Sequence, residues 1–346
     1  MGDPLISIII SSYNYARYLK QTIDSALGQT YPKVEVIVVD DGSRDGSPEV
    51  IKSYGQRIIA ILKENGGQAS SLNAGFAGSH GDIVIFLDSD DFLLPWAAER
   101  VVLAAGPGTA KVQYLLDLVG DQGDLLATGR QARPTFWGED ARRVLLTYGL
   151  YASQPTGGNA FARWVLDRVL PIPEKEFPTC PDAYLNATTP FEGTVVYIDE
   201  SLAACRLHAS NHSSWAWDIK AVSTDFEYQC KFQNYVALAA TKHGFSRPKH
   251  LEFRNYLYLR SRLACLRFAT DRHPYPGDWS IAIALRGVLA LWQWWGAVNW
   301  RKRMAWSVWF VLAAITPKAI ASRLTIWFYN FRARPPILRK LAALIR

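Results

Sequence analysis

The sequence has few of the residue types that build metal clusters and disulfide frameworks. Among 346 residues there are four cysteines and six histidines, and no two cysteines stand at Cys-x-x-Cys spacing. This pattern excludes a disulfide-stapled scaffold and a cysteine-based zinc or redox motif, so we expect free thiols in a reducing compartment. Glycine and proline, at 24 and 18 residues, are not in excess, which excludes a low-complexity chain.

Acidic residues are missing from the last fifth of the chain. The last one is Asp278, and residues 279–346 contain eleven Lys or Arg and eight of the 13 tryptophans. The tail therefore carries +11, and the formal net charge of +7 leaves −4 on residues 1–278. A charge step of this size predicts a boundary between two functions.

Long hydrophobic runs are also absent, because no uninterrupted run reaches the roughly 20 residues that a spanning helix needs. Segments 279–300, 304–316 and 319–331 are rich in Trp and other apolar residues, with Lys and Arg within or between them, and 337–346 is a short basic amphipathic pattern. This mixture is typical of helices that lie in a membrane interface. Re-entrant or spanning helices and a soluble oligomerisation module remain alternatives. We expect no nucleic-acid partner, because no such motif is present, and no signal peptide.

Four apolar runs in the first quarter of the chain alternate with helical patterns. The runs are 6–10, 34–39, 57–62 and 82–87, and the segments between them place apolar residues at helical spacing. Strands that alternate with helices predict βαβ units and a parallel sheet that helices cover on both faces. We therefore expect an α/β fold.

Each of these runs ends in a polar cluster. The clusters are Ser11–Asn14, Asp40–Ser43, Asn65–Gln68 and Asp88–Asp91. Ligands of open parallel sheets bind beyond the carboxyl ends of the strands. Clusters that follow strands at the same edge are therefore predicted to face one crevice.

The middle of the chain predicts further elements. Residues 111–129 predict a hairpin, 138–150 a helix, and 156–163 and 193–208 predict strands that extend the sheet. Residues 218–243 and 249–270 have helical patterns. Helices then continue into the basic, Trp-rich tail.

Three carboxylates stand within four positions in "DSDD", directly after the run at 82–87. Like charges gathered this closely are stable together with a cation, and Mg²⁺ or Mn²⁺ suits oxygen ligands. Mg²⁺ typically takes one or two protein carboxylates and completes its shell with substrate phosphates. The alternative is a solvated turn that caps the helix predicted near Pro95.

Three spaced blocks in this order resemble family 2 glycosyltransferases. They are "SIIISSYNYARYLKQTIDSALGQTYPKVEVIVVDDGSRDGS", "NGGQASSLNAGF" and "GDIVIFLDSDDFLLP". The resemblance is dense over residues 5–95 and weaker to about 215. It implies the GT-A fold, a Rossmann-like and mostly parallel sheet flanked by helices, and inverting transfer from a nucleotide-diphosphate sugar.

The resemblance also implies roles for the polar clusters. Tyr13 would stack on the base, Asp41 would hydrogen-bond it, and Asp88 would lie near the ribose or donor sugar. For each Ser, Asn and Gln, turn or cap chemistry is the alternative. The residues expected to hold the nucleotide-sugar are Ser11, Tyr13, Asn14, Asp41, Gln68, Asn73, Asp88, Ser89, Asp90 and Arg206. The expected ligands of a Mn²⁺ or Mg²⁺ cofactor are Asp90, Asp91 and His208.

The acceptor side follows in the second half of the resemblance. "PTGGNAFAR" (155–163) is similar to the segment that lines the acceptor and sugar pocket, which points to Gly158 and Asn159. "CPDAYLN" places Asp182 where the family has its general base, which the reaction needs because the acceptor hydroxyl loses a proton. Pro181 interrupts the familiar Glu-Asp pair, so a helix-capping role stays open for Asp182. The reserve candidates are Glu174, Glu176 and Glu192.

Two further segments bear on the activity. "CRLHASNHS" (205–213) resembles a family segment whose Arg and His approach the diphosphate or metal, which points to Arg206 or His208; a structural histidine is the alternative. Processive members carry Gln-x-x-Arg-Trp, and here Ala160 stands where Gln would precede Arg163 and Trp164. We therefore expect addition of a single sugar.

The expected organisation has three parts. Residues 1–215 form the catalytic domain (1–95 for the nucleotide, 96–215 for the acceptor), 216–278 a helical extension, and 279–346 a membrane-association region. The expected enzyme transfers a sugar, with UDP-sugar as the first choice, to a lipid-linked or surface-polysaccharide acceptor. We expect it in the cytoplasm, peripheral on the inner face of the cell membrane. An inactive membrane scaffold of the same fold and a nucleotidyltransferase remain alternatives.

Overall fold

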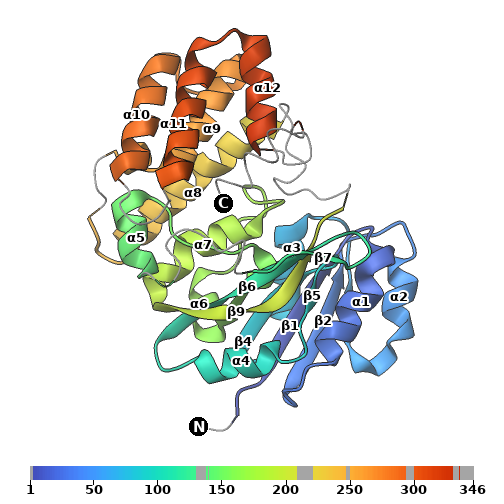
Figure 1. Ribbon diagram of the computed structural model, residues 1–346. Coiled ribbons are helices and arrows are strands. Elements are labelled where there is room, and N and C mark those ends of the chain that lie inside the picture. The colour runs from blue at the N-terminus through green and yellow to red at the C-terminus, as the bar shows by residue number, and fades with distance from the viewer. Residues whose placement is uncertain are drawn as a thin grey trace. The chain divides into compact units, whose positions relative to one another are not determined.

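The computed structural model describes residues 3–129, 138, 140–208, 221–246, 250–293, 300–329 and 335 (Figure 1). The chain divides into two compact units, which we describe separately. Unit 1 comprises residues 1–142 and 152–207, and unit 2 comprises residues 143–151 and 208–346. The basic pattern predicted at 337–346 lies outside the described residues.

The first half of unit 1 is a parallel sheet in the order β3-β2-β1-β4. Its strands are β1 (Ile6–Ser12), β2 (Val34–Asp40), β3 (Ile59–Leu62) and β4 (Ile83–Asp88). Every neighbouring pair among these four strands is parallel. The four strands predicted from the apolar runs are thus confirmed, together with their parallel order.

Helices pack on both faces of this sheet because alternate strand residues point to opposite sides. On one face Ile8 and Ile10 share a buried core with Leu19 and Ile23 of helix α1 (Ala16–Leu27). On the other face α3 (Gln68–Ala77) approaches so closely that a methyl group at Gly75 would clash with Ile9. Each fully buried Ile or Leu contributes roughly 1.5–3 kcal/mol of transfer free energy.

The second half of the sheet is mixed. Strand β8 (Asn159–Ala162) runs antiparallel to both β4 and β6 (Thr109–Val119), and β9 (Thr194–Arg206) runs parallel to β6. The short β7 (Leu125–Ala127) folds back on β6 as the predicted hairpin, and β5 (Phe92–Leu93) pairs with β9. The predicted strands at 156–163 and 193–208 are confirmed, with residues 156–158 forming a 3₁₀ turn, η2 (Thr156–Gly158), instead.

Four further helices complete unit 1. They are α2 (Ser47–Ser53), α4 (Ala97–Ala104), α6 (Arg163–Val169) and α7 (Pro181–Glu192), with a 3₁₀ turn η1 (Gly55–Arg57) after α2. Helix α7 begins after Cys180, whose φ of 61° lies in the left-handed region. The four cysteines of the chain are free thiols.

Unit 2 is helical. Its elements are most of α5 (Ala141–Tyr148), which begins in unit 1, and α8 (Val222–Lys242), η5 (Leu251–Arg254), α9 (Tyr256–Phe268), η6 (Thr270–Arg272), α10 (Ser280–Gln293), α11 (Trp300–Ile315) and α12 (Lys318–Tyr329). Helix α9 contacts α8, α10, α11 and α12, so it forms the centre of the bundle (Figure 1). The predicted three-part organisation stays a prediction. Among the described helices, none is both long and apolar enough to cross a membrane.

Candidate active site

The polar clusters meet at the carboxyl edge of the parallel strands. The strand register places Ser11 opposite Asp88 of β4, and Ser12 opposite Asp40 of β2. This neighbourhood follows from parallel pairing, because strands that start in register also end together. The predicted common edge is therefore present in the fold.

Asp88 occupies the last position of β4 and is held by two neighbours. The Gln68 amide donates to its Oδ1 at 2.6 Å, and Thr156 of η2 also hydrogen-bonds to it. Burial raises the pKa of Asp88 to about 7, with further raising contributions from the charges of Asp90 and Asp182, while the two hydrogen bonds oppose the shift. Asp88 thus lies among several carboxylates in a poorly solvated place.

The segment after Asp88 is anchored through its main chain. The Thr22 hydroxyl of α1 donates to the carbonyl oxygens of Ser89 and Asp91, at 2.9 and 2.7 Å. The carboxylate of Asp91 accepts from the backbone N–H of Arg206 at 2.9 Å and is buried. Burial and the neighbouring carboxylates Asp90 and Asp88 raise the pKa of Asp91 well above its ordinary value. Asp90 itself is half-buried.

Arg206 lies beneath this segment at the end of β9. Its guanidinium donates to the carbonyl oxygens of Asp90 (2.9 Å) and Asp121 (3.0 Å) and to the Gln21 side chain (2.6 Å). It also lies over the Tyr18 ring, 4.9 Å from the centroid, and is almost fully buried. The sequence suggested a contact with diphosphate; the structure shows a guanidinium that fixes the position of the Asp90 main chain.

Asp182 lies in the first turn of α7 and joins the carboxylate group at β4. Its charge acts on Asp88, which places the two side chains in one electrostatic neighbourhood. Burial raises the pKa of Asp182, while Lys111 and the first backbone amides of α7 lower it. Asp182 therefore interacts with the start of its helix, as the capping alternative requires, and also lies beside the Asp88 strand end.

Lys111 is a site residue that sequence reasoning missed. It lies in β6 with 0% exposure, and its ammonium donates to Asn186 Oδ1 and lies 5.3 Å from the Phe161 ring centroid. Asn186 is one helical turn after Asp182, so the two share a face of α7. Burial lowers the pKa of Lys111 well below its ordinary value, and Asp182 opposes that shift. A lysine inside the apolar run "AKVQYLL" was the available signal.

Asp41 organises the loop that follows β3. Its two carboxylate oxygens accept from the Lys63 ammonium (2.7 Å), the Asn65 amide (3.0 Å) and the backbone N–H groups of Gly66 (3.0 Å) and Gly67 (2.8 Å). Its neighbour Asp40 has one buried oxygen, Oδ1, without a hydrogen-bond partner. The base contact predicted for Asp41 stays a prediction, and Asp40 offers the oxygen that no protein donor uses.

The loop after β1 carries three residues in different environments. Tyr13 is 45% exposed at the edge, as a stacking residue would be. Asn14, with φ of 58°, accepts from the Arg44 N–H and donates its own N–H to Ser43, so it joins two loops. Tyr15 interacts with the carboxylates. Burial raises the pKa of Tyr15, and the charges of Asp90 and Asp88 raise it further.

Three predicted residues of unit 1 have partners other than the carboxylates. Asn73 exchanges hydrogen bonds with the backbone of Ile172 and donates to Glu174. The Asn159 amide donates to the carbonyls of Gln154 and Pro155, and Gly158 packs against the Gln154 side chain. His208 belongs to unit 2. The roles predicted for these four residues stay predictions.

The carboxylate set fits a divalent cation. The charge of Asp90 raises the pKa of both Asp88 and Asp91, and a cation removes this repulsion. Within the described residues, no three His, Cys, Asp or Glu side chains form a closed ligand set. An ion that binds one or two carboxylates and takes its other ligands from a diphosphate needs no closed set.

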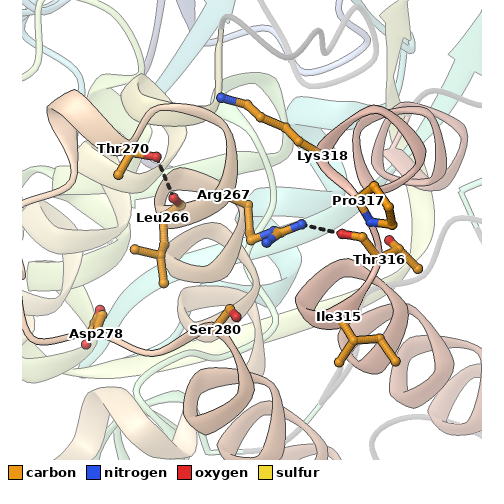
Figure 2. A pocket seen from close by; sticks show the side chains of 9 residues that line it. All are labelled: Leu266, Arg267, Thr270, Asp278, Ser280, Ile315, Thr316, Pro317 and Lys318. Carbon is orange, nitrogen blue, oxygen red and sulfur yellow. Dashed lines mark hydrogen bonds between the residues drawn. The ribbon is translucent and has the colours of Figure 1, made fainter.

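A separate cavity of about 610 Å³ lies in unit 2, far along the chain from these residues (Figure 2). It is lined by Leu266, Arg267, Thr270, Asp278, Ser280, Ile315, Thr316, Pro317 and Lys318. None of the residues predicted to hold the nucleotide-sugar lines it.

Known proteins resemble this chain in sequence and in fold. The family model for glycosyl transferase family 2 matches residues 7–151. A glycosyltransferase of Nostoc sp. is 35% identical over 234 residues, which is 66% of this chain and 71% of the relative. Identity over so long a stretch shows common family membership.

Two solved structures share the fold. Staphylococcus aureus TarS, residues 1–349 in complex with UDP, aligns with a TM-score of 0.50 and 15% identity over 90% of each chain. The Pyrobaculum calidifontis mannosyltransferase, in complex with GDP-Man and Mn²⁺, aligns with a TM-score of 0.51 and 20% identity, over 92% of this chain and 87% of that one. Together with the matched family model, these likenesses identify the chain as a glycosyltransferase of family 2 with the GT-A fold.

Proposed function

We propose that the enzyme transfers one sugar, with inversion, from a nucleotide-diphosphate sugar to an acceptor hydroxyl, with UDP-sugar as the first candidate donor. The observation that carries the proposal is the position of Asp182. A carboxylate from α7 interacts with Asp88 at the end of β4, so one side chain suited to accept a proton lies beside the carboxylates of the nucleotide side.

Asp182 is the proposed general base. Its raised pKa makes the carboxylate a better proton acceptor than a solvated aspartate, and the nearby Lys111 opposes that rise. The acceptor oxygen transfers its proton to Asp182 as it bonds to the anomeric carbon, and the bond to the nucleotide diphosphate breaks on the opposite face. The remaining residues position the donor for this displacement.

The donor side is built by the strand ends. Asp88, held by Gln68 and Thr156, is placed to accept hydrogen bonds from ribose or sugar hydroxyls, and Tyr13 is exposed for stacking on the base. Asp91 already accepts a backbone N–H, so Asp90 is the proposed main ligand of Mn²⁺ or Mg²⁺, with Asp91 in reserve. When bound, the ion supplies positive charge that stabilises the leaving diphosphate.

The proposals for the acceptor and for the location are based on the composition of the tail, residues 279–346. Its eleven cations and eight tryptophans support a lipid-linked or surface-polysaccharide acceptor. We place the enzyme in the cytoplasm, on the inner face of the cell membrane. A donor-hydrolysis screen over nucleotide-sugars with Mn²⁺ or Mg²⁺ identifies the base and sugar.

The first test replaces the base. With the donor found in that screen, Asp182→Asn should lower the transfer kcat by about 10²–10⁴-fold, because the proton acceptor is lost, while the donor KM changes little. Asp167→Asn on α6, an exposed aspartate, is the matched control and should retain full activity. Full transfer by folded Asp182→Asn would contradict the assignment and return attention to the reserve glutamates.

A second variant tests the metal carboxylates. Asp90→Asn combined with Asp91→Asn should remove metal-dependent transfer while the circular-dichroism spectrum keeps its shape. If the double variant transferred sugar at the wild-type rate at every metal concentration, the carboxylates would have no role in metal binding.

A further inference from the structure

Helix α10 exposes an apolar stripe. Ile281, Leu285, Leu289 and Trp292 follow one another at intervals of four, four and three residues, and each is between 44% and 59% exposed. This spacing places them on one side of the helix. The opposite side, with Ile283 among others, is buried in the bundle.

Helix α11 exposes a matching stripe. Met304, Val308, Val311 and Ile315 recur at intervals of four, three and four residues, and are between 43% and 61% exposed. These four and the four of α10 are called the outer face.

The two stripes lie on the same side of the bundle. Helices α10 and α11 are antiparallel neighbours, because Ser280 bonds to Ala314 and Trp292 bonds to Ser307. Both helices also pack on α9 through their buried residues. Side chains that point away from α9 on two adjacent helices form one continuous surface. Eight large apolar residues in such a surface exceed the scattered exposure that is normal for a soluble protein.

The charge around the outer face indicates what kind of partner it binds. Residues 279–346 contain no acidic residue, and Arg286, Arg301 and Lys302 are exposed on the two helices. Trp279 and Trp300, at the beginnings of the two helices, are also strongly exposed, as is typical at a water–lipid boundary. A second copy would bring like charges together, whereas an anionic lipid surface would complement them.

We propose that the outer face docks on the surface of an anionic lipid bilayer, with its apolar side chains in the headgroup–acyl boundary and the surrounding cations against lipid phosphates. This docking is independent of the sugar transfer proposed above.

The cavity of unit 2 adds a feature at one end of this face. Ile315, the last residue of the α11 stripe, lines the cavity together with Arg267 and Lys318 (Figure 2). The third charged side chain there, Asp278, is bound by Arg262 and His273. The cavity therefore presents two cations beside an apolar surface, which suits the phosphate of a lipid headgroup.

The test compares two pairs of substitutions in the full chain. Vesicles of phosphatidylcholine with about 30 mol% phosphatidylglycerol should bind the wild type in co-sedimentation, and phosphatidylcholine alone should bind it roughly tenfold more weakly. Leu285→Gln with Val308→Gln should lower binding to the anionic vesicles by about tenfold or more. Leu103→Gln with Leu238→Gln is the matched control, because both leucines are exposed but lie on α4 and α8, outside the outer face. The control should bind as the wild type does.

Three results would overturn the proposal. The first is that the wild type does not bind anionic vesicles, and the second is that the outer-face variant binds them as well as the wild type does. The third is that the wild type self-associates without lipid in sedimentation equilibrium and the outer-face variant does not. Donor hydrolysis, measured in parallel, should be the same in both pairs and in the wild type. A loss of docking with intact hydrolysis counts against this inference and the membrane location, and leaves the proposed sugar transfer standing. A wild type that docks without hydrolysis counts against the proposed sugar transfer alone.

Discussion

At the residue scale, Lys111 changes how Asp182 is understood. A buried lysine is costly unless it is hydrogen-bonded and near an opposite charge. Lys111 has both, because Asn186 accepts its hydrogen bond and Asp182 lies within electrostatic reach. We interpret it as a positioning residue that opposes the burial-driven rise in the pKa of the proposed base.

This interpretation predicts a shift in the pH profile. Burial raises the pKa of Asp182 and Lys111 opposes that rise, so Lys111→Met should raise the pKa of Asp182 further. Because the base must be deprotonated, the acidic limb of kcat/KM should move to higher pH, by about one unit.

The measurement is kcat/KM against pH for Lys111→Met and for Lys52→Met, which replaces an exposed lysine of α2. The control profile should match the wild type. An unchanged acidic limb in a folded Lys111→Met protein would show that the lysine does not act on the base.

At the element scale, the end of β9 holds the segment after β4. The Arg206 guanidinium binds the Asp90 carbonyl, and its backbone N–H binds the Asp91 carboxylate. One residue thus fixes the "DSDD" segment from two directions. The carboxylates are therefore arranged by a strand that lies more than a hundred positions away in the sequence.

Arg206→Met should loosen this arrangement. The carbonyl oxygens of Asp90, Gly120 and Asp121 and the Gln21 side chain lose their donor, which should lower the stability of unit 1 by about 3 kcal/mol and raise the donor KM. Urea unfolding and donor kinetics measure both effects. Arg100→Met, which removes an arginine in an exposed ion pair with Glu200, should cost less than about 0.5 kcal/mol. Equal stability of the two variants would refute the anchoring role.

At the scale of the whole molecule, the two compact units have separate buried cores. The unit 2 bundle contains a buried charge cluster, in which Arg262 donates to both oxygens of Asp278 at 2.6 and 2.7 Å and His273 lies 2.8 Å away. Burial alone would raise the pKa of Asp278, but hydrogen bonds from Arg262 and His273 lower it below 3.8.

We expect Asp278→Asn to destabilise unit 2 by about 2–4 kcal/mol at pH 7, because a buried arginine loses its counter-charge. A carboxyl group whose pKa is lowered in the folded state adds stability at pH values above its ordinary pKa. This contribution is lost as the pH falls through the folded-state pKa. The difference in unfolding free energy between Asp278→Asn and the wild type should therefore become smaller at acidic pH. Denaturant titrations should show that the transition altered by Asp278→Asn differs from the one altered by Arg206→Met; a single shared transition would contradict separate cores.

The sequence by itself determined the parallel half of the sheet and the edge at which the site lies. Short, nearly continuous apolar runs specify strands that are buried on both faces, and polar residues directly after each run need only the parallel order to come together. The position of Asp88 and its neighbours at this edge could be predicted in this way. The basic tail could be predicted from its charge alone.

Only the tertiary structure decided what individual side chains bind. Asn73 and Arg206 are polar residues in the expected segments, yet their partners, Ile172 and Asp90, are distant in sequence. The sequence places Lys111 in a predicted hairpin, and only the fold brings Asn186 and Asp182 of α7 near it. Hydrogen bonds and charge interactions depend on distances across the fold, and spacing along the chain does not encode those distances.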